Sequence, residues 1–391
     1  MTLQSNVNVQ LRYGVESTLG VASAVAGQSL RRISSTLALT KDAFTSNEVR
    51  PDQQVYDARH GSRRVAGNIQ GELSTQSYDD FLEAAMRGTW VAGISASQAD
   101  FTTLTVTAGK FVAGGGSFLA KGFKVGDVFK LAGFVHANVG VKFRILGATA
   151  TQLTVYPTPV AMTSQSTFTM AVTGKKLLCG MTQRSFSIEQ HYPEIDLSEM
   201  FLGCRIGDMA ISLPPTGMAS VSFGVMGLNM ASTTGASAPV FASPTAAAAT
   251  GVLAGVGGSL SVAGAPSAIV TQLDLSLSNA LSGTPVVGST IVPEIFYGRM
   301  VVTGTLSAYF ADQTMLDYFL NETEIALAAQ LDDANGTDFM AFRMNRVKLM
   351  GANKTVGPDG GVILQSPFQS LLSSGVSGYD DGSLVIQRSN A

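Results

Sequence analysis

The chain has 391 residues, of which 45% are apolar and only 14% are charged, and its formal net charge is −3. This length allows two or three domains with separate cores, but a charge content well below the roughly 25% of ordinary soluble domains suggests that other subunits cover much of the surface. The small negative charge argues against tight nucleic-acid binding, which requires a basic stripe.

The N-terminal residues 1–30 are expected to form an arm. They lack the basic head and apolar run of a secretory signal. No membrane-spanning segment is expected, because the stretch from Pro239 to Val270 consists largely of Ala, Gly, Ser and Pro and is typical of an extended linker. Cys179 and Cys204 are the only cysteines and form no C-x-x-C motif, so a reducing compartment such as the cytoplasm is expected.

A stretch near the beginning of the chain returns in altered form near its end. "RRVAGNIQGELSTQSYDDFL" (63–82) and "RMVVTGTLSAYFADQTMLDYFL" (299–320) each contain a V-x-G step in an alternating strand, then a polar turn, then the start of a helix. The helices are expected to begin near Tyr78 and Gln313. This repetition indicates a duplicated folding unit.

The match extends upstream of both stretches. Residues 33–44 and 273–281 both alternate with the period of a strand. An acidic residue, Asp57 in the first copy and Glu294 in the second, stands four positions before a glycine. The two copies therefore share an order of features although their identity is low.

Downstream, residues 204–213 resemble 342–351, with Arg205 aligned to Arg343. Each is followed by a Gly/Pro turn and a return strand, which predicts a long β-hairpin. The first copy has about 90–100 additional residues before this hairpin. These contain short alternating strands at regular spacing, typical of a small all-β domain inserted in a surface loop.

The predicted fold is mostly β, with two tandem sandwich or half-barrel modules, each flanked by a short helix, and an inserted small all-β domain of barrel or immunoglobulin-like type. The expected divisions are an N-terminal arm (1–30), module one in two parts (31–91 and 181–230), the inserted domain (92–180), a linker rich in Ala, Gly and Ser (231–265) and module two (266–391). Barrel strands are expected within 33–40, 63–74, 205–225, 272–278, 299–311 and 343–366.

No pattern of catalytic or metal-binding residues stands out. The acidic run formed by Glu189, Glu194, Asp196 and Glu199 around His191 matches no known metal loop, and such runs are usually solvated. G-x-S-x-G, H-E-x-x-H and a nucleotide-binding glycine loop in a strand–helix setting are all absent. We therefore expect no enzymatic activity, no cofactor and no metal.

The basic cluster "RHGSRR" (59–64) is the sharpest charged feature. It could contact nucleic acid or an acidic neighbour, or it could protect a strand edge from unwanted pairing. The second copy repeats only the second half of this cluster, as Arg299, so a contact between subunits is favoured over recognition of nucleic acid. Unpaired sheet edges can continue into neighbouring copies and close a ring, and six module positions would then require three chains.

The candidate subunit contacts follow from this hypothesis. Within a ring, basic side chains of one chain would meet acidic side chains of its neighbour, and arm residues would contact the next ring. The candidates within a ring are Arg59, Arg63, Arg64 and Arg299 with Asp79, Asp80, Glu83 and Asp317, and those between rings are Arg12, Tyr13 and Glu16.

The order of these features resembles the major tail tube proteins of long-tailed, siphovirus-type bacteriophages, here in a two-module form. The resemblance covers about 270 residues in both modules, and no part of it is catalytic. Its most characteristic points are "YDDFLEAAMRGTW", the P-P-x-G turn at Pro214, Pro215 and Gly217, and "GRMVVTGTLSAYFADQTMLDYFL". The family implies a β-sandwich with a packed helix, rings that stack into a hollow tube for DNA passage, and for two modules a pseudo-hexameric trimer.

The resemblance also implies partners and a location. Other copies of the chain would form the ring and stacking contacts, a tape measure protein would occupy the lumen during assembly, and tail terminator and distal tail proteins would bind the tube ends. Double-stranded DNA would pass transiently without sequence-specific binding, so the lumen should carry few Lys or Arg. The protein would be assembled in the host cytoplasm and reside in the virion tail.

Other interpretations remain open at this point. A different ring-forming tail component, such as a distal or terminator protein, is the nearest alternative. A surface adhesin or carbohydrate-binding β protein fits less well, since an export signal is absent and Trp90 is the only tryptophan. An oligomeric enzyme would require a polar cluster that the sequence does not offer.

Overall fold

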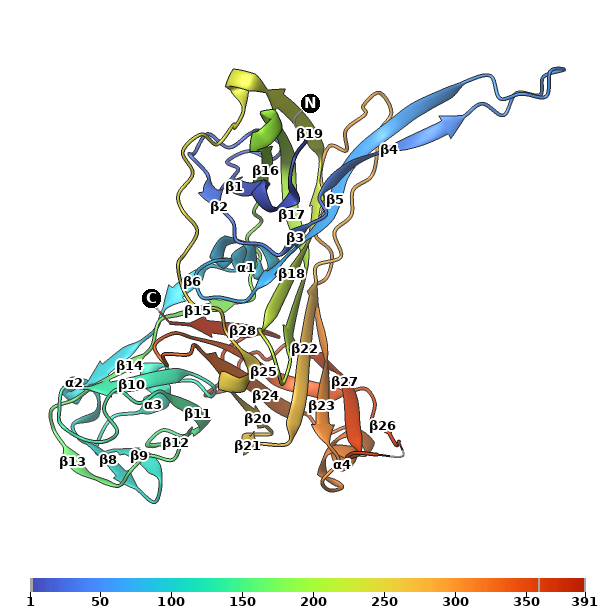
Figure 1. Cartoon of the computed structure of the whole chain (residues 1–391). Helices are drawn as coiled ribbons and strands as arrows, with labels where there is room; N and C mark the ends of the chain where they lie inside the picture. Colours follow the sequence, from blue (N-terminus) through green and yellow to red (C-terminus); the bar gives the residue numbers. More distant parts are fainter. Residues whose placement is uncertain (1–2, 358, 390–391) are drawn as a thin grey trace.

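The computed structural model describes residues 3–357 and 359–389, and it is built mostly of β-strands (Figure 1). One sheet of 20 strands contains strands of both modules, and a separate eight-stranded sheet is formed by the inserted segment. The mostly-β fold expected from the sequence is confirmed.

Module one is a sandwich of two layers, which we call its inner and outer sheets. Alternating apolar residues such as Val65 and Ile69 face the space between the layers. The inner sheet contains β3 (Ser34–Ser35), β4 (Ala38–Thr45), β5 (Ala58–Glu72), β18 (Ser220–Gly227) and the second half of β17 (Leu197–Leu213). The outer sheet contains β2 (Gln28–Ser29), β1 (Gln10–Val15), β16 (Phe186–Tyr192), the first half of β17 and β19 (Asn229–Thr234).

Module two has the same two layers. Its inner sheet contains β22 (Val270–Ser278), β23 (Val301–Tyr309), β27 (Ile363–Ser370), the end of β25 (Phe339–Leu349) and β26 (Asn353–Thr355). Its outer sheet contains β21 (Ala265–Ser267), β20 (Gly258–Val262), β24 (Ile325–Asp332), the start of β25, β28 (Val385–Arg388), β15 (Lys175–Leu178) and β6 (Trp90–Ala92). The segments expected to be an arm and a linker thus each supply an outer-sheet strand, β1 and β20.

One helix accompanies each module, and both begin where the sequence predicts. α1 (Asp79–Met86) starts directly after Tyr78, and α4 (Thr314–Leu320) starts directly after Gln313. Acidic residues in the first turn of each helix favour these starting points. The helices differ in burial: α1 buries five of its residues, whereas every residue of α4 is partly or fully exposed. α1 is therefore packed in the core of module one, whereas α4 lies at the surface of module two.

The shared register of the two modules corrects one alignment. A break in the pairing of β16 with β17 places Phe186 opposite Cys204, and the same break in β24 and β25 places Ile325 opposite Val347. Cys204 therefore corresponds to Val347, and the next residue, Arg205, corresponds to Lys348. The sequence alignment of Arg205 with Arg343 is wrong, because an alternating strand pattern of low identity does not fix the register.

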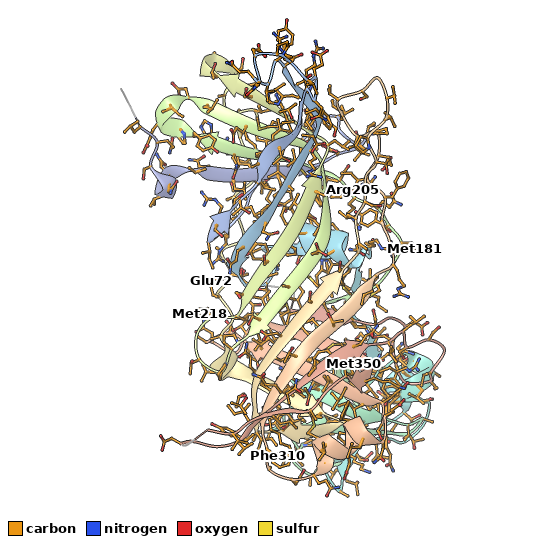
Figure 2. The ribbon with its side chains drawn as sticks, turned by 90° about the vertical axis from the view of Figure 1, so that its right-hand side faces the viewer. Glu72, Met181, Arg205, Met218, Phe310 and Met350 are labelled. Atoms are coloured by element: carbon orange, nitrogen blue, oxygen red, sulfur yellow. The ribbon has the colours of Figure 1, made fainter. Side chains whose placement is uncertain are left out.

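The inner sheets of the two modules join into one continuous sheet. β17 of module one pairs with β22 of module two, from Asp208 opposite Ser278 to Leu213 opposite Leu273. The order is β4–β5–β18–β17–β22–β23–β27, and Figure 2 shows these long strands side by side. This continuous inner sheet ends at β3 and β4 on one side and at β25 and β26 on the other.

Aromatic packing fills the core of module one. Phe81 of α1 lies with its ring centroid 4.9 Å from that of Tyr13, 5.1 Å from that of Phe186 and 5.4 Å from that of Phe223. These four residues come from a helix and from both layers of the sandwich, so the helix joins the layers. Truncating such a buried ring costs about 3–5 kcal/mol.

The inserted segment forms its own small β domain. Its strands are β7 (Ser95–Ser97), β8 (Leu104–Thr107), β9 (Lys110–Ala113), β10 (Val128–Ala132), β11 (Phe143–Ala148), β12 (Gln152–Tyr156), β13 (Met162–Gln165) and β14 (Thr169–Val172). Two short helices, α2 (Gln98–Phe101) and α3 (Phe118–Lys121), complete it. Its separate core contains Phe101, Phe111, Phe118, Phe123, Phe129 and Phe143. In Figure 1 the domain lies on the opposite side of the molecule from the continuous inner sheet.

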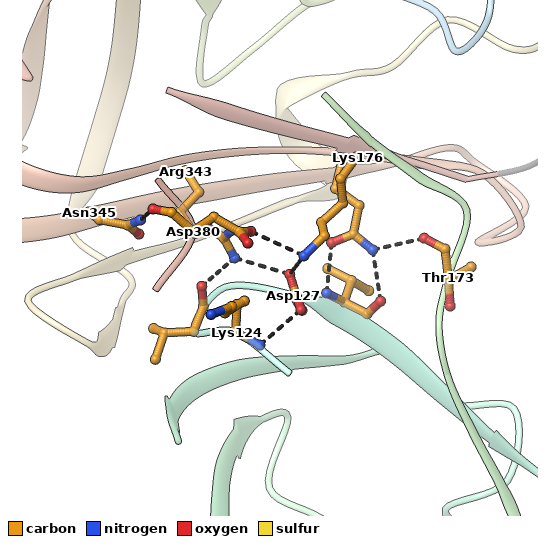
Figure 3. A network of polar contacts seen from close by, with 10 residues as sticks. Lys124, Asp127, Thr173, Lys176, Arg343, Asn345 and Asp380 are labelled. Atoms are coloured by element: carbon orange, nitrogen blue, oxygen red, sulfur yellow. Dashed lines mark hydrogen bonds and ion pairs between the residues drawn. The ribbon is translucent and has the colours of Figure 1, made fainter. Parts of the chain in front are cut away.

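Although inserted in module one, this domain docks on module two through a buried ion network (Figure 3). Asp127 accepts hydrogen bonds from Lys176 at 2.9 Å and from Arg343 at 3.2 Å. Asp380 accepts from Lys176 at 3.1 Å and also from Arg343. Burial alone would raise the pKa of Asp380, but the positive charges of Arg343 and Lys176 outweigh it and hold that pKa below its usual value. We call these four residues the buried ion network.

Arg343 reaches the network across a glycine. An added Cβ at Gly126 would lie 2.1 Å from the Cδ of Arg343, and the φ of Gly126 is +87°. Glycine is therefore required there both for its backbone conformation and for the passage of the arginine. Beside the network, Gln387 donates to the carbonyl oxygens of Val128 and Thr173, each at 2.8 Å.

Candidate assembly surfaces

The face of the continuous inner sheet that points away from the core is polar. Side chains alternate along each strand, so the residues between the core positions all point to this face. They are mostly Ser, Thr, Asn, Gln and Ala. They include Arg64, Ala66, Asn68, Gln70, Glu72, Asp208, Ala210, Ser212, Ser220, Ser222, Gly224, Asp274, Ser276, Ser278, Thr303, Thr305, Lys348, Gln365, Pro367 and Gln369.

This polar face is hollowed into a trough of about 710 Å³, and Figure 2 looks onto it. Gln70, Ser222, Asp274 and Gln369 are among its lining residues. Glu72, Asp208 and Asp274 bring negative charge to the face, and Arg64 and Lys348 bring positive charge, since Lys348 lies directly opposite Gln369 on the neighbouring strand. A duplex-sized polyanion would meet few cations there.

The two ends of the continuous inner sheet expose large apolar side chains. Near β3 and β4, Ile33 is 55% exposed and Phe44 is 62% exposed. Near β25 and β26, Met350 is 51% exposed and Val356 is 77% exposed. Unpaired strands combined with exposed apolar side chains are typical of surfaces that bind another chain.

The pairing of β17 with β22, which we call the internal junction, is an example of two strand edges joined within the chain. Backbone pairing of β17 with β22 brings Met209 and Ile211 beside Leu275 and Leu277 in the core. The side chain of Leu281 packs against Gly207 of β17. The junction is therefore both a hydrogen-bonded and an apolar contact.

A charged contact supports the same junction. Arg205 of module one forms an ion pair with Glu294 of module two at 2.7 Å. The Arg205 guanidinium also lies over the Tyr297 ring, 5.3 Å from the centroid. In the sequence, Asp57 and Glu294 each stand four positions before a glycine. This shared spacing is the signal that could have pointed to Glu294 as one partner of the Arg205 ion pair.

The predicted basic contacts have different surroundings. Arg59 lies on the projecting β4–β5 hairpin and pairs with Asp57 at 3.3 Å. Arg63 donates to Asn229 and Thr290, each at 3.2 Å, so it supports the internal junction. Arg64 points to the polar face, and Arg299 is exposed. Arg59, Arg64 and Arg299 are accessible in the single chain.

Most of the predicted acidic contacts have partners within the chain. The partners come from distant segments, except for that of Asp317. Asp79 pairs with Arg388 at 2.5 Å, Asp80 accepts from the Tyr13 hydroxyl at 2.9 Å, Glu83 pairs with Arg184 at 2.9 Å, and Asp317 accepts from Gln313 at 2.8 Å. Burial raises the pKa of the Asp79 carboxyl, although Arg388 opposes the shift.

The predicted contacts of the N-terminal segment are turned inward. Arg12 is buried and donates to the Phe241 carbonyl oxygen at 2.6 Å. Tyr13 is buried, and burial together with Asp80 raises the pKa of its hydroxyl. Glu16 is buried and accepts from the backbone N–H of Gly203 at 2.9 Å. In the single chain these three side chains hold β1 in the outer sheet.

The acidic run is also engaged in structural hydrogen bonds. Glu189 accepts from the backbone N–H groups of Val240 and Phe241 at 2.6 and 3.0 Å. Glu199 accepts from the Tyr192 hydroxyl at 2.9 Å. Within residues 3–357 and 359–389, no three His, Cys, Asp or Glu side chains are grouped so as to hold a metal ion.

These features define a class of protein. A duplicated sandwich with a continuous sheet, a polar hollow face and two unpaired edges is the architecture of a β-structured assembly subunit.

The chain belongs to the phage tail tube protein family, whose family model matches residues 6–370. It is therefore a structural component of the tail in the phage virion. A search of curated proteins found no match. Across the described part of the chain, none of the helices has the length and apolar character needed to cross a membrane.

Proposed function

We propose that three copies of this chain close into a ring and that the rings stack into a hollow tube through which the genome passes during ejection. The observation that supports this most directly is the internal junction of β17 with β22. Because the two modules share one architecture, the free edge of module two can join the free edge of module one in the next chain as β17 joins β22. Three chains then supply six modules.

The repeat fixes the register of this contact. Leu273 pairs with Leu306, and Ser35 pairs with Ile69 at the equivalent place of module one, so Leu273 corresponds to Ser35. Thr355 and Ser212 occupy equivalent places in their hairpins. Ser212 lies opposite Asp274 where β17 pairs with β22. Asp274 follows Leu273 as Thr36 follows Ser35, so these two residues are equivalent. In the proposed ring, Thr355 of one chain would therefore lie opposite Thr36 of the next.

The charged contact transfers in the same way. Arg205 corresponds to Lys348, and Glu294 corresponds to Asp57. The ion pair of Arg205 with Glu294 at 2.7 Å would therefore have an intermolecular counterpart, in which Lys348 of one chain leaves its exposed partner Glu322 and pairs with Asp57 of the next. Of the residues considered earlier, the exposed Arg59, two positions from Asp57, stays a candidate for this junction.

The polar face would line the lumen of such a ring. A surface of hydroxyl and amide groups with Glu72, Asp208 and Asp274 repels phosphate weakly, so DNA would slide without being retained. The inserted domain lies on the opposite side of the sheet and would decorate the exterior of the tube. This arrangement leaves the passage free.

The proposal includes the partners of a siphovirus-type tail. A tape measure protein would occupy the lumen during assembly in the host cytoplasm, and terminator and distal tail proteins would bind the ends. Candidate contacts on the ring are the exposed Arg64 and Arg299 and the half-buried Asp317. Arg64 would lie at the margin of the lumen.

Negative-stain microscopy of the purified protein tests this function. We expect long hollow tubes for the wild type and monomers for Lys354→Pro, because proline in β26 blocks edge pairing in an already exposed strand. Val135→Pro, at a fully exposed position of the inserted domain, is the matched control and should still form tubes. Monomers of the wild type under all conditions would contradict the proposal, and single rings that never stack would indicate a distal or terminator protein instead.

A further inference from the structure

A groove of about 830 Å³ lies at the free edge of module one, between β1 and β3. Its apolar residues include Leu11, Leu30 and Leu37, all nearly buried. Polar groups of Ser35, Gln190 and Tyr192 also line it. An open groove of mixed polar and apolar lining beside an unpaired strand is a surface that another chain can fill.

Module two has the same groove at the same place, between β20 and β22. The strand pairing shows which lining residues are equivalent. The pair Leu11 and Gln190 in module one corresponds to the pair Leu260 and Ala329 in module two. Likewise, Ser35 of the first groove corresponds to Leu273 of the second. The second groove is smaller, about 370 Å³. The two cavities are therefore two copies of one site in different states.

The difference between the grooves has a visible cause. The hairpin turn of module one, with Leu213, Pro214 and Pro215, lines the groove of module two, together with Tyr156 of the inserted domain. Leu213 is only 9% exposed there. Among the described residues, the groove of module one is lined only by β16 of module one and by the chain from just before β1 to just after β3.

The residue that corresponds to Leu213 lies near the other end of the chain. Val356 follows Thr355 as Leu213 follows Ser212, so Val356 corresponds to Leu213. Val356 is 77% exposed, whereas its counterpart is buried at the internal junction. A largely exposed apolar residue and an open groove thus lie at opposite edges of one sheet.

We propose that Val356, the residue directly after β26, inserts from one chain into the β1–β3 groove of the next chain, as Leu213 inserts beside β20 within this chain. This inference rests on the proposed ring and specifies the contact that closes it. The groove and Val356 lie at opposite edges of the sheet, so the contact is head-to-tail. Such contacts build closed rings or open filaments and not isolated two-fold dimers.

Disulfide trapping tests the inference. The pair Ser35→Cys and Val356→Cys, in a Cys179→Ser background, should give reducible oligomers of two and three chains on a denaturing gel. The pair Leu213→Cys and Leu273→Cys occupies the equivalent position inside one chain and should give an intramolecular disulfide.

A second pair controls for random collision. Val356→Cys with Val135→Cys places the second thiol on the inserted domain, far from the groove in the fold, and should give few oligomers. If tubes form but the Ser35→Cys and Val356→Cys pair is trapped no better than this control, Val356 does not enter the groove and the inference is wrong. If microscopy shows neither tubes nor rings, the proposed function itself fails.

Discussion

Removing the guanidinium of Arg343 should destabilise the contact between the inserted domain and module two. The Arg343 side chain is 6% exposed, and the carboxylates of Asp127 and Asp380 are 0% and 10% exposed. In the Arg343→Ala variant, both carboxylates would depend on Lys176 alone. One uncompensated negative charge would then remain buried.

The size of the loss follows from the geometry. At the 3.2 Å separating Arg343 from Asp127, Coulomb's law with an effective dielectric constant of about 20 gives about 5 kcal/mol. Breaking one side of a buried ion pair typically costs about 3–5 kcal/mol, which agrees with this value. With an m-value of about 3 kcal/mol per molar, the urea midpoint should fall by about 1–2 M.

Urea titration monitored by the fluorescence of Trp90, the only tryptophan, measures this shift. Trp90 lies in β6, beside the strand that carries Lys176, so it reports on the relevant region. The matched control is Arg346→Ala, on the same strand, because Arg346 pairs with Glu324 at the exposed surface. A shift for Arg343→Ala no larger than that of the control would refute the reasoning.

The same variant should change the response to acid. The pKa of Asp380 is held below its usual value of 3.8 by Arg343 and Lys176. A carboxyl with a lowered pKa in the folded state contributes stability above its unfolded pKa and loses it as the pH falls through the folded value. The wild type should therefore lose stability below about pH 4 more steeply than Arg343→Ala, as measured by urea midpoints between about pH 5 and pH 2.

Three further outcomes are expected. Lys348→Glu should raise several-fold the protein concentration needed for tube formation, measured by sedimentation. Adding Asp57→Lys to that variant should return this concentration to the wild-type value, and a double variant without such rescue would contradict the proposed ion pair. Because burial raises the pKa of the Cys204 thiol, that thiol should not react with a thiol reagent at pH 8 in the native protein, whereas unfolding in urea should expose both it and Cys179. Tubes of Ser222→Arg should co-sediment with duplex DNA at low salt and release it at high salt, and wild-type tubes that bind DNA equally well would contradict the neutral lining.

The sequence predicts the local structure of the modules well. The strand alternation of β5 and β23 and the helix starts after Tyr78 and Gln313 depend on neighbouring residues, and the structure agrees with them. Local patterns give the faces of a strand because side chains alternate. They do not give the strand that lies beside it, so the pairing of β1 with β16 and of β20 with β24 was not predicted.

The candidate contacts illustrate the same limit. Asp80 and Asp79 look like free acids at a helix start, but their partners, Tyr13 and Arg388, come from the two ends of the chain. Only the tertiary fold brings these groups together. By contrast, the equivalence of Asp57 and Glu294 could be read directly, because it depends on spacing within each copy.

Tandem duplication also determines how the wall of the trough can evolve. Ser222 of module one and Gln365 of module two occupy equivalent places on the polar face, yet they are encoded separately. In a protein with one module per chain, a single codon change would alter every position around the axis at once. In the proposed ring of three two-module chains, a codon change would alter only alternate positions, so natural selection could adjust the lumen lining of the two modules separately.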